Sequence, residues 1–173
     1  LAGKSGVTTI THFDTSAYEV HFAAEVKEFD ASPYFSDRDQ KRYSRNIQYA
    51  VSAASDAVKN SGLNVDSLDK SRAGVILASG MGGMDVYYDT SATLANKGPR
   101  RVSPFFIPMA ITNMAAGEVS IRFGFMGPNF TTTSACASSN HALIAAADQI
   151  RLGRADVMLA GGSEESVSYV SLS

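Results

Sequence analysis

One stretch decides the fold: Asn129 to Glu164, NFTTTSACASSNHALIAAADQIRLGRADVMLAGGSE. It opens with Phe130 to Thr133, an aromatic and β-branched run typical of a strand. Ala137 to Leu152 has the length and composition of a helix and ends at a glycine. Asp156 to Ala160 predicts a second strand, ended by two glycines. Strand, helix and strand in this order predict a βαβ unit, so the two strands should be parallel.

Cys136, the only cysteine, lies where the first strand turns into the helix. There a thiol meets the unpaired N–H groups and the positive dipole end of the helix, which favour the nucleophilic thiolate. The backbone N–H of the same residue could stabilise an oxyanion on a substrate carbonyl. The pattern therefore indicates a nucleophile. The alternative is a small buried apolar residue, which is the common role of a lone cysteine.

The helix after Cys136 has almost no polar face before Asp148. A helix that is apolar nearly all round is a buried helix, and its many alanines allow close approach on both sides. We therefore expect it to lie between two sheets. The strand Asp156 to Ala160 is apolar on both faces, as in the middle of a parallel sheet.

Several motifs resemble those of one family. Thr133 to Ser139 (TSACASS) resembles the active-site motif of β-ketoacyl-acyl-carrier-protein synthases of the thiolase superfamily, and Ala155 to Glu164 resembles the strand that follows it there. The segments HFDTSAY, SGMGGM, PFFIPMAITNMAAG and MGPN, in chain order, are similar to the type II elongating subfamily. Ser134 departs from the usual threonine. We interpret residues 1–173 as one α/β unit, the N-terminal half of a thiolase-type layered αβαβα sandwich, truncated at both ends.

The resemblance implies decarboxylative Claisen condensation of an acyl thioester with malonyl carrier protein in fatty acid elongation, through an acyl-Cys136 intermediate. It implies no cofactor and no metal. In the family the second half supplies two histidines, a lysine and a glycine-rich phenylalanine loop, so this stretch alone should be inactive. The alternatives are a polyketide-type ketosynthase or a non-catalytic subunit similar to a chain-length factor. An acyl-hydrolase using Ser163 is a further alternative, although Glu165 stands where a serine-hydrolase elbow has glycine.

Composition narrows the class of protein. The chain has 173 residues, 45% hydrophobic and 18% charged, which indicates a folded domain rather than disorder. A formal charge of −2 argues against a nucleic-acid binder driven by bulk charge. One cysteine fits a reducing compartment, and no apolar run reaches the roughly 18 residues of a membrane span. We therefore expect no membrane partner and a location in the cytoplasm or in an organelle stroma or matrix.

Basic residues gather at the start of a long helix predicted from Asp37 to Asn60, with Ser36 as its N-cap and Gly62 as its end. The helix dipole disfavours cations there. They are therefore either a solvated face or a docking patch for an acidic partner. In the family, the corresponding positions receive acidic acyl carrier protein. The resemblance therefore assigns carrier binding to five residues: Arg38, Lys41, Arg42, Arg100 and Arg101.

A glycine-rich turn, Ser79 to Met84, follows the apolar strand predicted from Ala73 to Ala78 and precedes a helix. A dinucleotide site is disfavoured because Asp85 stands where the fingerprint requires a third glycine. Met81 lies between two glycines, and an adaptable apolar side chain suits a surface that opens and closes. The resemblance assigns Met81 to a gate of the acyl pocket. The alternative is simple core packing.

The apolar cluster around Phe106 and Ile107 should be covered by core or by a partner. In the family this region lies at the homodimer interface and lines the acyl pocket of the neighbouring subunit, so we expect a homodimer. A base for Cys136 would be a histidine or a similar group. His12 and His21 lie in polar stretches, and His141 is expected to be a core histidine that points away from the helix start.

Overall fold

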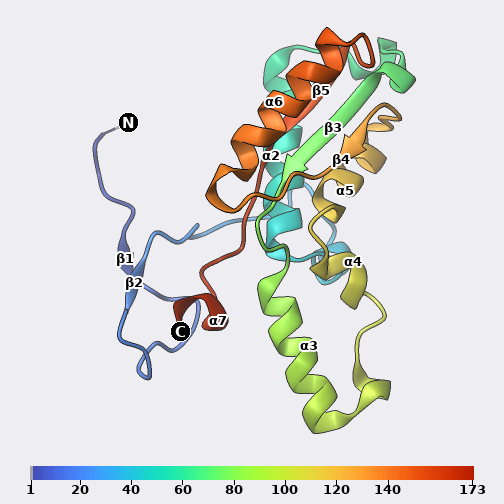
Figure 1. Cartoon of the computed structure of the whole chain (residues 1–173). Coiled ribbons are helices and arrows are strands. Elements are labelled where there is room, and N and C mark those ends of the chain that lie inside the picture. Colours follow the sequence, from blue (N-terminus) through green and yellow to red (C-terminus); the bar gives the residue numbers. More distant parts are fainter. Residues whose placement is uncertain (1) are drawn as a thin grey trace.

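The computed structural model describes residues 2–173, which fold around a three-stranded parallel sheet (Figure 1). The strand order is β4 (Asn129–Phe130), β3 (Ala73–Ala78) and β5 (Val157–Gly162). In register, Val75 of β3 lies opposite Asn129 on one side and Leu159 on the other. The architecture is α/β, and β3 occupies the residues that the sequence predicts.

Side chains of β3 alternate between two buried layers. Val75 and Leu77 pack in a core with α2 (Arg45–Ser61) and α5 (Met114–Phe123). Ile76 and Ala78 pack on the opposite face against α6 (Ser138–Arg151). Both faces of the strand are thus covered, which explains its uninterrupted apolar sequence. The sheet carries helices on both faces and brings the loops after β3 and β5 to one edge (Figure 1).

The predicted βαβ unit is confirmed, with three corrections. The first strand, β4, covers only Asn129–Phe130 and does not extend to Thr133. β4 and β5 are parallel, but β3 lies between them, so β5 is an edge strand of this sheet and only partly buried. The expectation that it is the middle of the sheet is wrong for the described residues. The strand also includes Gly161 and Gly162 instead of ending before them. A side chain at Gly162 would collide with Ser139 Oγ, so glycine allows β5 to lie against the start of α6.

Helix α6 is buried on one side only, which corrects the prediction of burial all round. Ala142 and Ala146 are buried against the sheet, whereas Leu143 and Ile144 are 53% and 57% exposed. One sheet covers one face of a helix, so the apolar residues of the opposite face stay accessible in this chain.

The helix predicted from Asp37 to Asn60 is two helices, α1 (Asp37–Gln40) and α2. The predicted boundaries are correct: Ser36 Oγ accepts a hydrogen bond from Asp39 N, and Gly62 ends α2 with a left-handed φ of 69°. The break between them is held by Gln48, whose Nε2 donates to the carbonyls of Gln40 and Tyr43, both at 2.9 Å. These side-chain bonds replace backbone bonds that a continuous helix would make.

Two further parts of the chain lie outside the sheet and the helices that cover it. Helix α3 (Met84–Lys97) leads away from the sheet to a 3-10 turn, Pro99–Arg101, and the chain returns through the short helix α4 (Phe106–Ala110) (Figure 1). Beside them, β1 (Thr8–Thr9) and β2 (Phe22–Ala23) pair antiparallel near α7 (Tyr169–Leu172).

Short 3-10 turns complete the described chain, at Val65–Ser67, Lys70–Arg72 and Ala135–Ala137. Among the helices of residues 2–173, none combines the length and apolar character that crossing a membrane requires.

Candidate active site

A cavity of about 460 Å³ opens where β3 and β5 end and α6 begins. Three segments contribute to its lining: residues 78–81, residues 135, 136, 138 and 139, and residues 162–164 with residue 166. Cys136, Met81 and Glu164 each contribute to this lining. The parallel sheet explains the arrangement, because the carboxyl ends of neighbouring strands meet at one edge and the following loops face one another there.

Cys136 lies in the 3-10 turn Ala135–Ala137, directly before α6, and its free thiol is exposed. The turn is sharp: Ala135 has a φ of 49°, an unusual conformation for a residue with a side chain. Ser138 Oγ stabilises it by accepting from Ser134 N at 2.8 Å and donating to Ala135 O at 2.7 Å. The thiol is therefore held at the helix start and open to the cavity, which excludes the alternative of a buried apolar cysteine.

His141 contacts the segment that precedes Cys136. Its Nδ1 lies 2.6 Å from Ser134 Oγ, and the residue is exposed. The expectation of a core histidine that points away from the helix start is wrong. Side chains of a helix lean toward its N-terminus, so a residue one turn in can reach the residues before the helix.

The other two histidines lie elsewhere. His12 Nε2 is 3.5 Å from Asp85 Oδ2, and His21 Nδ1 is 3.3 Å from Thr15 Oγ1. Within the described residues, no histidine lines the cavity around Cys136.

Met81 is 42% exposed and lies on the loop between β3 and α3. Gly82 requires glycine, because its φ is 69° and an added Cβ would collide with Ala110 O. The loop is anchored by Ser79 Oγ, which accepts from Gly82 N at 2.9 Å. Met81 is thus not packed in the core, and it contributes to the lining of the Cys136 cavity, while its role as a gate of an acyl pocket stays a prediction.

Glu164 is a site residue that the sequence analysis missed. Its carboxylate accepts hydrogen bonds from Gly80 N at 2.5 Å and from Ser79 Oγ at 3.2 Å. The available signal was positional: Glu164 comes just after β5, and the glycine-rich turn comes just after the neighbouring strand β3. A carboxylate beside exposed glycine amides is a natural acceptor for them.

The hydroxyl of Ser163 is not free to act as a hydrolase nucleophile. Its Oγ donates to Asn46 O at 2.8 Å, so the hydroxyl serves to join β5 to α2. Asp85, at the start of α3, faces His12, and burial raises the pKa of its carboxyl group. A carboxylate at this helix start opposes a pyrophosphate, in agreement with the sequence argument against a dinucleotide.

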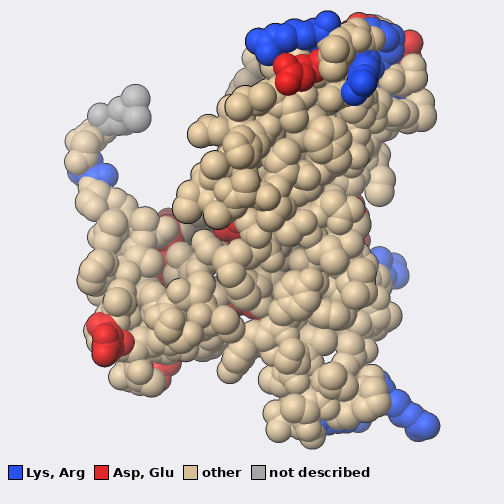
Figure 2. Space-filling model, viewed as in Figure 1, with Lys and Arg blue, Asp and Glu red and all other residues tan. Residues whose placement is uncertain are grey.

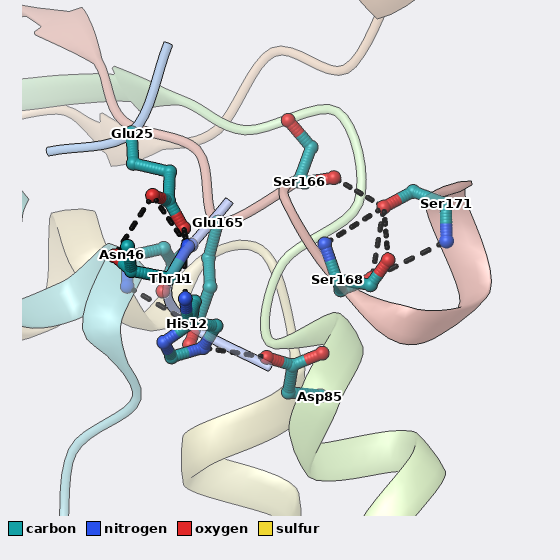
Figure 3. Close-up of polar contacts among 9 residues, drawn as sticks. All are labelled: Thr11, His12, Glu25, Asn46, Asp85, Glu165, Ser166, Ser168 and Ser171. Atoms are coloured by element: carbon teal, nitrogen blue, oxygen red, sulfur yellow. Dashed lines mark hydrogen bonds and ion pairs between the residues drawn. The ribbon is translucent and has the colours of Figure 1, made fainter. Parts of the chain in front are cut away.

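Glu165 does not line the Cys136 cavity, and its side chain lies beside Asn46 at the start of α2 (Figure 3). Its carboxylate accepts from Asn46 N at 3.3 Å, and His12 and Asp85 lie nearby. Burial raises the pKa of Glu165 from 4.5 to about 7 despite this hydrogen bond. The two adjacent glutamates therefore have different surroundings, Glu164 at the Met81 loop and Glu165 at α2.

The five basic residues fall into two groups, and all except the half-buried Arg42 are exposed. Arg38 lies in α1 and Lys41 at its C-cap, so the argument that the helix dipole disfavours them does not hold. Arg42 lies 4.9 Å from the ring centroid of Phe105 and 3.9 Å from Asp39 Oδ1.

Arg100 and Arg101 form the second group. They are exposed on the 3-10 turn at the far end of α3, where Figure 2 shows a group of blue side chains. The contact of Arg42 with Phe105 connects the first group to the loop that leaves this turn.

Phe106 and Ile107 lie in α4, away from the lining of the Cys136 cavity. The ring of Phe106 meets Tyr87 edge-on, with centroids 5.4 Å apart, while Ile107 is 56% exposed. The structure thus leaves Ile107 free to contact another molecule.

Residues 1–172 match the family model described as "Beta-ketoacyl synthase, N-terminal domain". The chain belongs to the β-ketoacyl synthase family. It is 41% identical over 177 residues to the chloroplastic 3-oxoacyl-[acyl-carrier-protein] synthase I of Hordeum vulgare, covering 99% of this chain and 38% of that protein. It is 43% identical over 166 residues to 3-oxoacyl-[acyl-carrier-protein] synthase 2 of Vibrio cholerae, covering 96% and 40%.

Solved structures of ketosynthases share the fold. A β-ketoacyl synthase from Burkholderia phymatum matches with a TM-score of 0.85 at 26% identity, over 98% of this chain and 42% of that one. The ishigamide ketosynthase/chain length factor matches with a TM-score of 0.87 at 26% identity, over 99% and 43%. These neighbours confirm the predicted thiolase-type α/β fold. The chain spans about two fifths of the curated relatives that it matches.

Proposed function

We propose that the whole protein is a β-ketoacyl-acyl-carrier-protein synthase that elongates fatty acyl chains. The observation that carries the proposal is the exposed Cys136 thiol, held by a strained turn at the start of α6 and facing a cavity that Met81 also lines. Membership of the family and the names of its relatives support the class of reaction.

The proposed reaction has two stages. The Cys136 thiol loses its proton, and the thiolate attacks the carbonyl of an acyl chain carried as a thioester. The new bond forms to Sγ, the bond to the carrier sulfur breaks, and the carrier leaves as a thiolate that takes up the proton lost by Cys136. A malonyl thioester then loses carbon dioxide, and the carbanion that remains attacks the acyl carbon and releases the Cys136 thiolate. Covalent catalysis divides one difficult carbon–carbon bond formation into two easier steps. The reaction needs no cofactor.

At the first stage, the backbone around Cys136 has a second role. The N–H groups at the start of α6 have no acceptors within the helix and carry its positive dipole end. They can hydrogen-bond the oxyanion that develops on the acyl carbonyl. The exposed position of Cys136 leaves room for that tetrahedral species.

An acidic acyl carrier protein is the proposed partner, received by Arg38, Lys41, Arg42, Arg100 and Arg101. One structural neighbour is a polyketide ketosynthase in complex with its acyl-carrier protein, with a TM-score of 0.80 at 28% identity, which supports a carrier as the substrate form. We also propose a homodimer, in which the exposed Ile107 and the neighbouring Phe106 reach the acyl pocket of the second subunit. The names of the plant and bacterial relatives support a place in an organelle stroma or in the cytoplasm.

A polyketide-type ketosynthase is the second candidate, because two structural neighbours are named as such or as a ketosynthase/chain length factor pair. A non-catalytic subunit is disfavoured by the presence of Cys136. The hydrolase alternative is disfavoured because the Ser163 hydroxyl is bonded to Asn46 O.

The test uses the whole protein and acyl carrier protein loaded with a fatty acyl chain. Mass spectrometry of proteolytic peptides should find the acyl mass on the peptide that contains Cys136. Cys136→Ala should abolish the modification, and Cys136→Ser should be much slower, since a hydroxyl does not form its anion readily. Acylation that persists in Cys136→Ala would refute the assignment.

A further inference from the structure

Glu164 holds the loop that carries Met81. Its carboxylate accepts from Gly80 N at 2.5 Å, from Ser79 Oγ at 3.2 Å and from Met81 N at 3.4 Å. The contact is close on the backbone side as well, since a Cβ at Gly80 would lie 2.9 Å from Glu164 Oε2. Two backbone amides and one hydroxyl therefore converge on a single side chain.

The register of the sheet brings these groups together. Ala78 of β3 lies opposite Gly162 of β5, and Ser163 N donates to Ala78 O at 3.0 Å beyond the last pair. Ser79 and Glu164, which follow these paired positions, therefore lie close enough to hydrogen-bond. Hydrogen bonds to an ionised carboxylate are stronger than those between neutral groups, so one such side chain can restrain a glycine-rich loop.

Ser79 extends this restraint to the rest of the site. It is 2% exposed, and its Oγ also accepts from Gly82 N at 2.9 Å and from Asn46 Nδ2 at 3.3 Å. Its carbonyl accepts from Thr133 Oγ1 at 3.0 Å, three residues before Cys136. The buried Ser79 thus contacts both the loop that carries Met81 and the segment that carries Cys136.

We propose that Glu164 is a positioning residue: it fixes the loop Ser79–Gly82, and with it Met81, at the cavity of Cys136, and so sets which acyl chain lengths the thiol accepts. The inference deepens the proposed function and rests on it. Glu164 acts through the loop and not on the reacting atoms. Its carboxylate accepts hydrogen bonds from backbone amides, whereas Met81 supplies the apolar surface of the gate.

The first experiment measures acylation of Cys136 against chain length in the whole protein. In Glu164→Gln one carboxylate oxygen becomes an amide that cannot accept a hydrogen bond. Loosening the loop should raise the ratio of long-chain to short-chain acylation rates roughly fivefold, about the effect of one hydrogen bond. Glu164→Asp keeps the charge and should restore part of the wild-type profile.

Glu165→Gln is the matched control. It removes the neighbouring carboxylate, which contacts Asn46 N and none of the loop amides, and it should leave the ratio unchanged. An unchanged ratio in Glu164→Gln, or an equal loss for all chain lengths, would overturn the inference. A wild-type protein that is not acylated at Cys136 would instead overturn the proposed function.

Amide hydrogen exchange supplies a readout that does not depend on activity. The amides of Gly80 and Met81 should exchange faster in Glu164→Gln than in the wild type, whereas those of β3 should not change. Equal exchange at Gly80 and Met81 in both proteins would refute the restraint whatever the kinetics. If Glu164→Gln does not fold, the same two measurements are made on Glu164→Asp. Its shorter side chain keeps the charge but weakens the contact, so both readouts should shift in the same direction as expected for Glu164→Gln, by a smaller amount.

Discussion

Ser134 Oγ lies 2.6 Å from His141 Nδ1, so the residue two before Cys136 is tied to the first turns of the helix that follows it. The contact spans the turn at Ala135, whose φ of 49° is unfavourable for a residue with a side chain. A strained turn persists only where its surroundings hold it, and this hydrogen bond together with Ser138 supplies that restraint. We therefore expect the position of the thiol to depend on His141.

Removing the imidazole should misplace Cys136 without removing the nucleophile. We expect His141→Ala to lower the rate of Cys136 acylation roughly fivefold, about the effect of one lost hydrogen bond. Ser134→Ala should cost about the same, and the double variant no more than either, because both changes remove one interaction. The rate constant for acylation by acyl carrier protein is the measurement.

Two controls accompany this experiment. Ser134→Thr retains the hydroxyl and should retain the rate. His21→Ala removes a histidine that contacts Thr15 outside the cavity lining, so it should have no effect. Additive losses in the His141 and Ser134 variants would mean that the two side chains act independently.

Local sequence patterns were sufficient for the elements whose cause is local. The continuous apolar run predicts β3 correctly, and Ser36 and Gly62 mark the outer helix ends because caps depend on the residues at the ends themselves. The break between α1 and α2 was missed because the side chain that holds it, Gln48, lies inside the second helix. Its bonds to Gln40 and Tyr43 have no periodic signature.

Part of the site was also predictable, because some of its residues are marked by their type and their immediate neighbours in the sequence. Cys136 and Met81 stand out by residue type within a motif, and the structure brings both to one cavity. Glu164 has no such mark, because its role depends on β3 and β5 being neighbours, and that pairing joins segments about 80 residues apart. The exposed face of α6 was also missed, because periodicity shows that a helix is apolar but not how many sheets cover it.

Carrier binding should depend on the basic residues of the proposed docking patch. Changing Lys41 and Arg42 together to Glu should raise KM for carrier-bound substrate and leave a free pantetheine thioester nearly unaffected. The difference should shrink with added salt, since exposed charges are screened over about 10 Å at 0.1 M. Steady-state kinetics with both substrates at two salt concentrations is the measurement.

Lys59→Glu is the matched control for charge, because Lys59 is an exposed cation in the last turn of α2. It should leave KM unchanged. Since Arg42 also contacts Phe105, the single variant Lys41→Glu separates charge from packing. Equal losses with carrier-bound and free substrate would make the patch structural.

Glu165 should make stability depend on pH. Its pKa rises from 4.5 to about 7 on folding because burial disfavours the charged form. The stability associated with its protonated form is therefore fully present below pH 4.5 and is lost as the pH rises through about 7. The loss amounts to about 3 kcal/mol at most.

Glu165→Gln cannot ionise, so its free energy of unfolding relative to wild type should increase from pH 5 to pH 8. Urea unfolding of the whole protein at several pH values measures this difference. Glu19→Gln, at an exposed glutamate, should show no such trend. A constant difference between Glu165→Gln and wild type would mean that Glu165 ionises equally in the folded and unfolded states.

Met81 gives the sharpest prediction of chain-length selection. The side chain is 42% exposed on a loop flanked by glycines, and it lines the cavity of Cys136. A bulkier Met81→Phe should fold but accept only short acyl chains on Cys136, because the added ring occupies space that a long chain needs. Met81→Ala should accept long chains at least as well as the wild type, since it removes the obstruction.

The measurement is the rate of Cys136 acylation against acyl chain length for both variants. Met126→Phe and Met126→Ala are the controls, because Met126 is 72% exposed and lies outside the cavity lining. They should leave the profile unchanged. Profiles for Met81→Phe and Met81→Ala that run parallel to the wild type, shifted only in overall rate, would remove Met81 from the pocket. Opposite shifts of the two profiles, with Glu164→Gln shifted in the direction of Met81→Ala, would show that the gate and its restraint act on the same step.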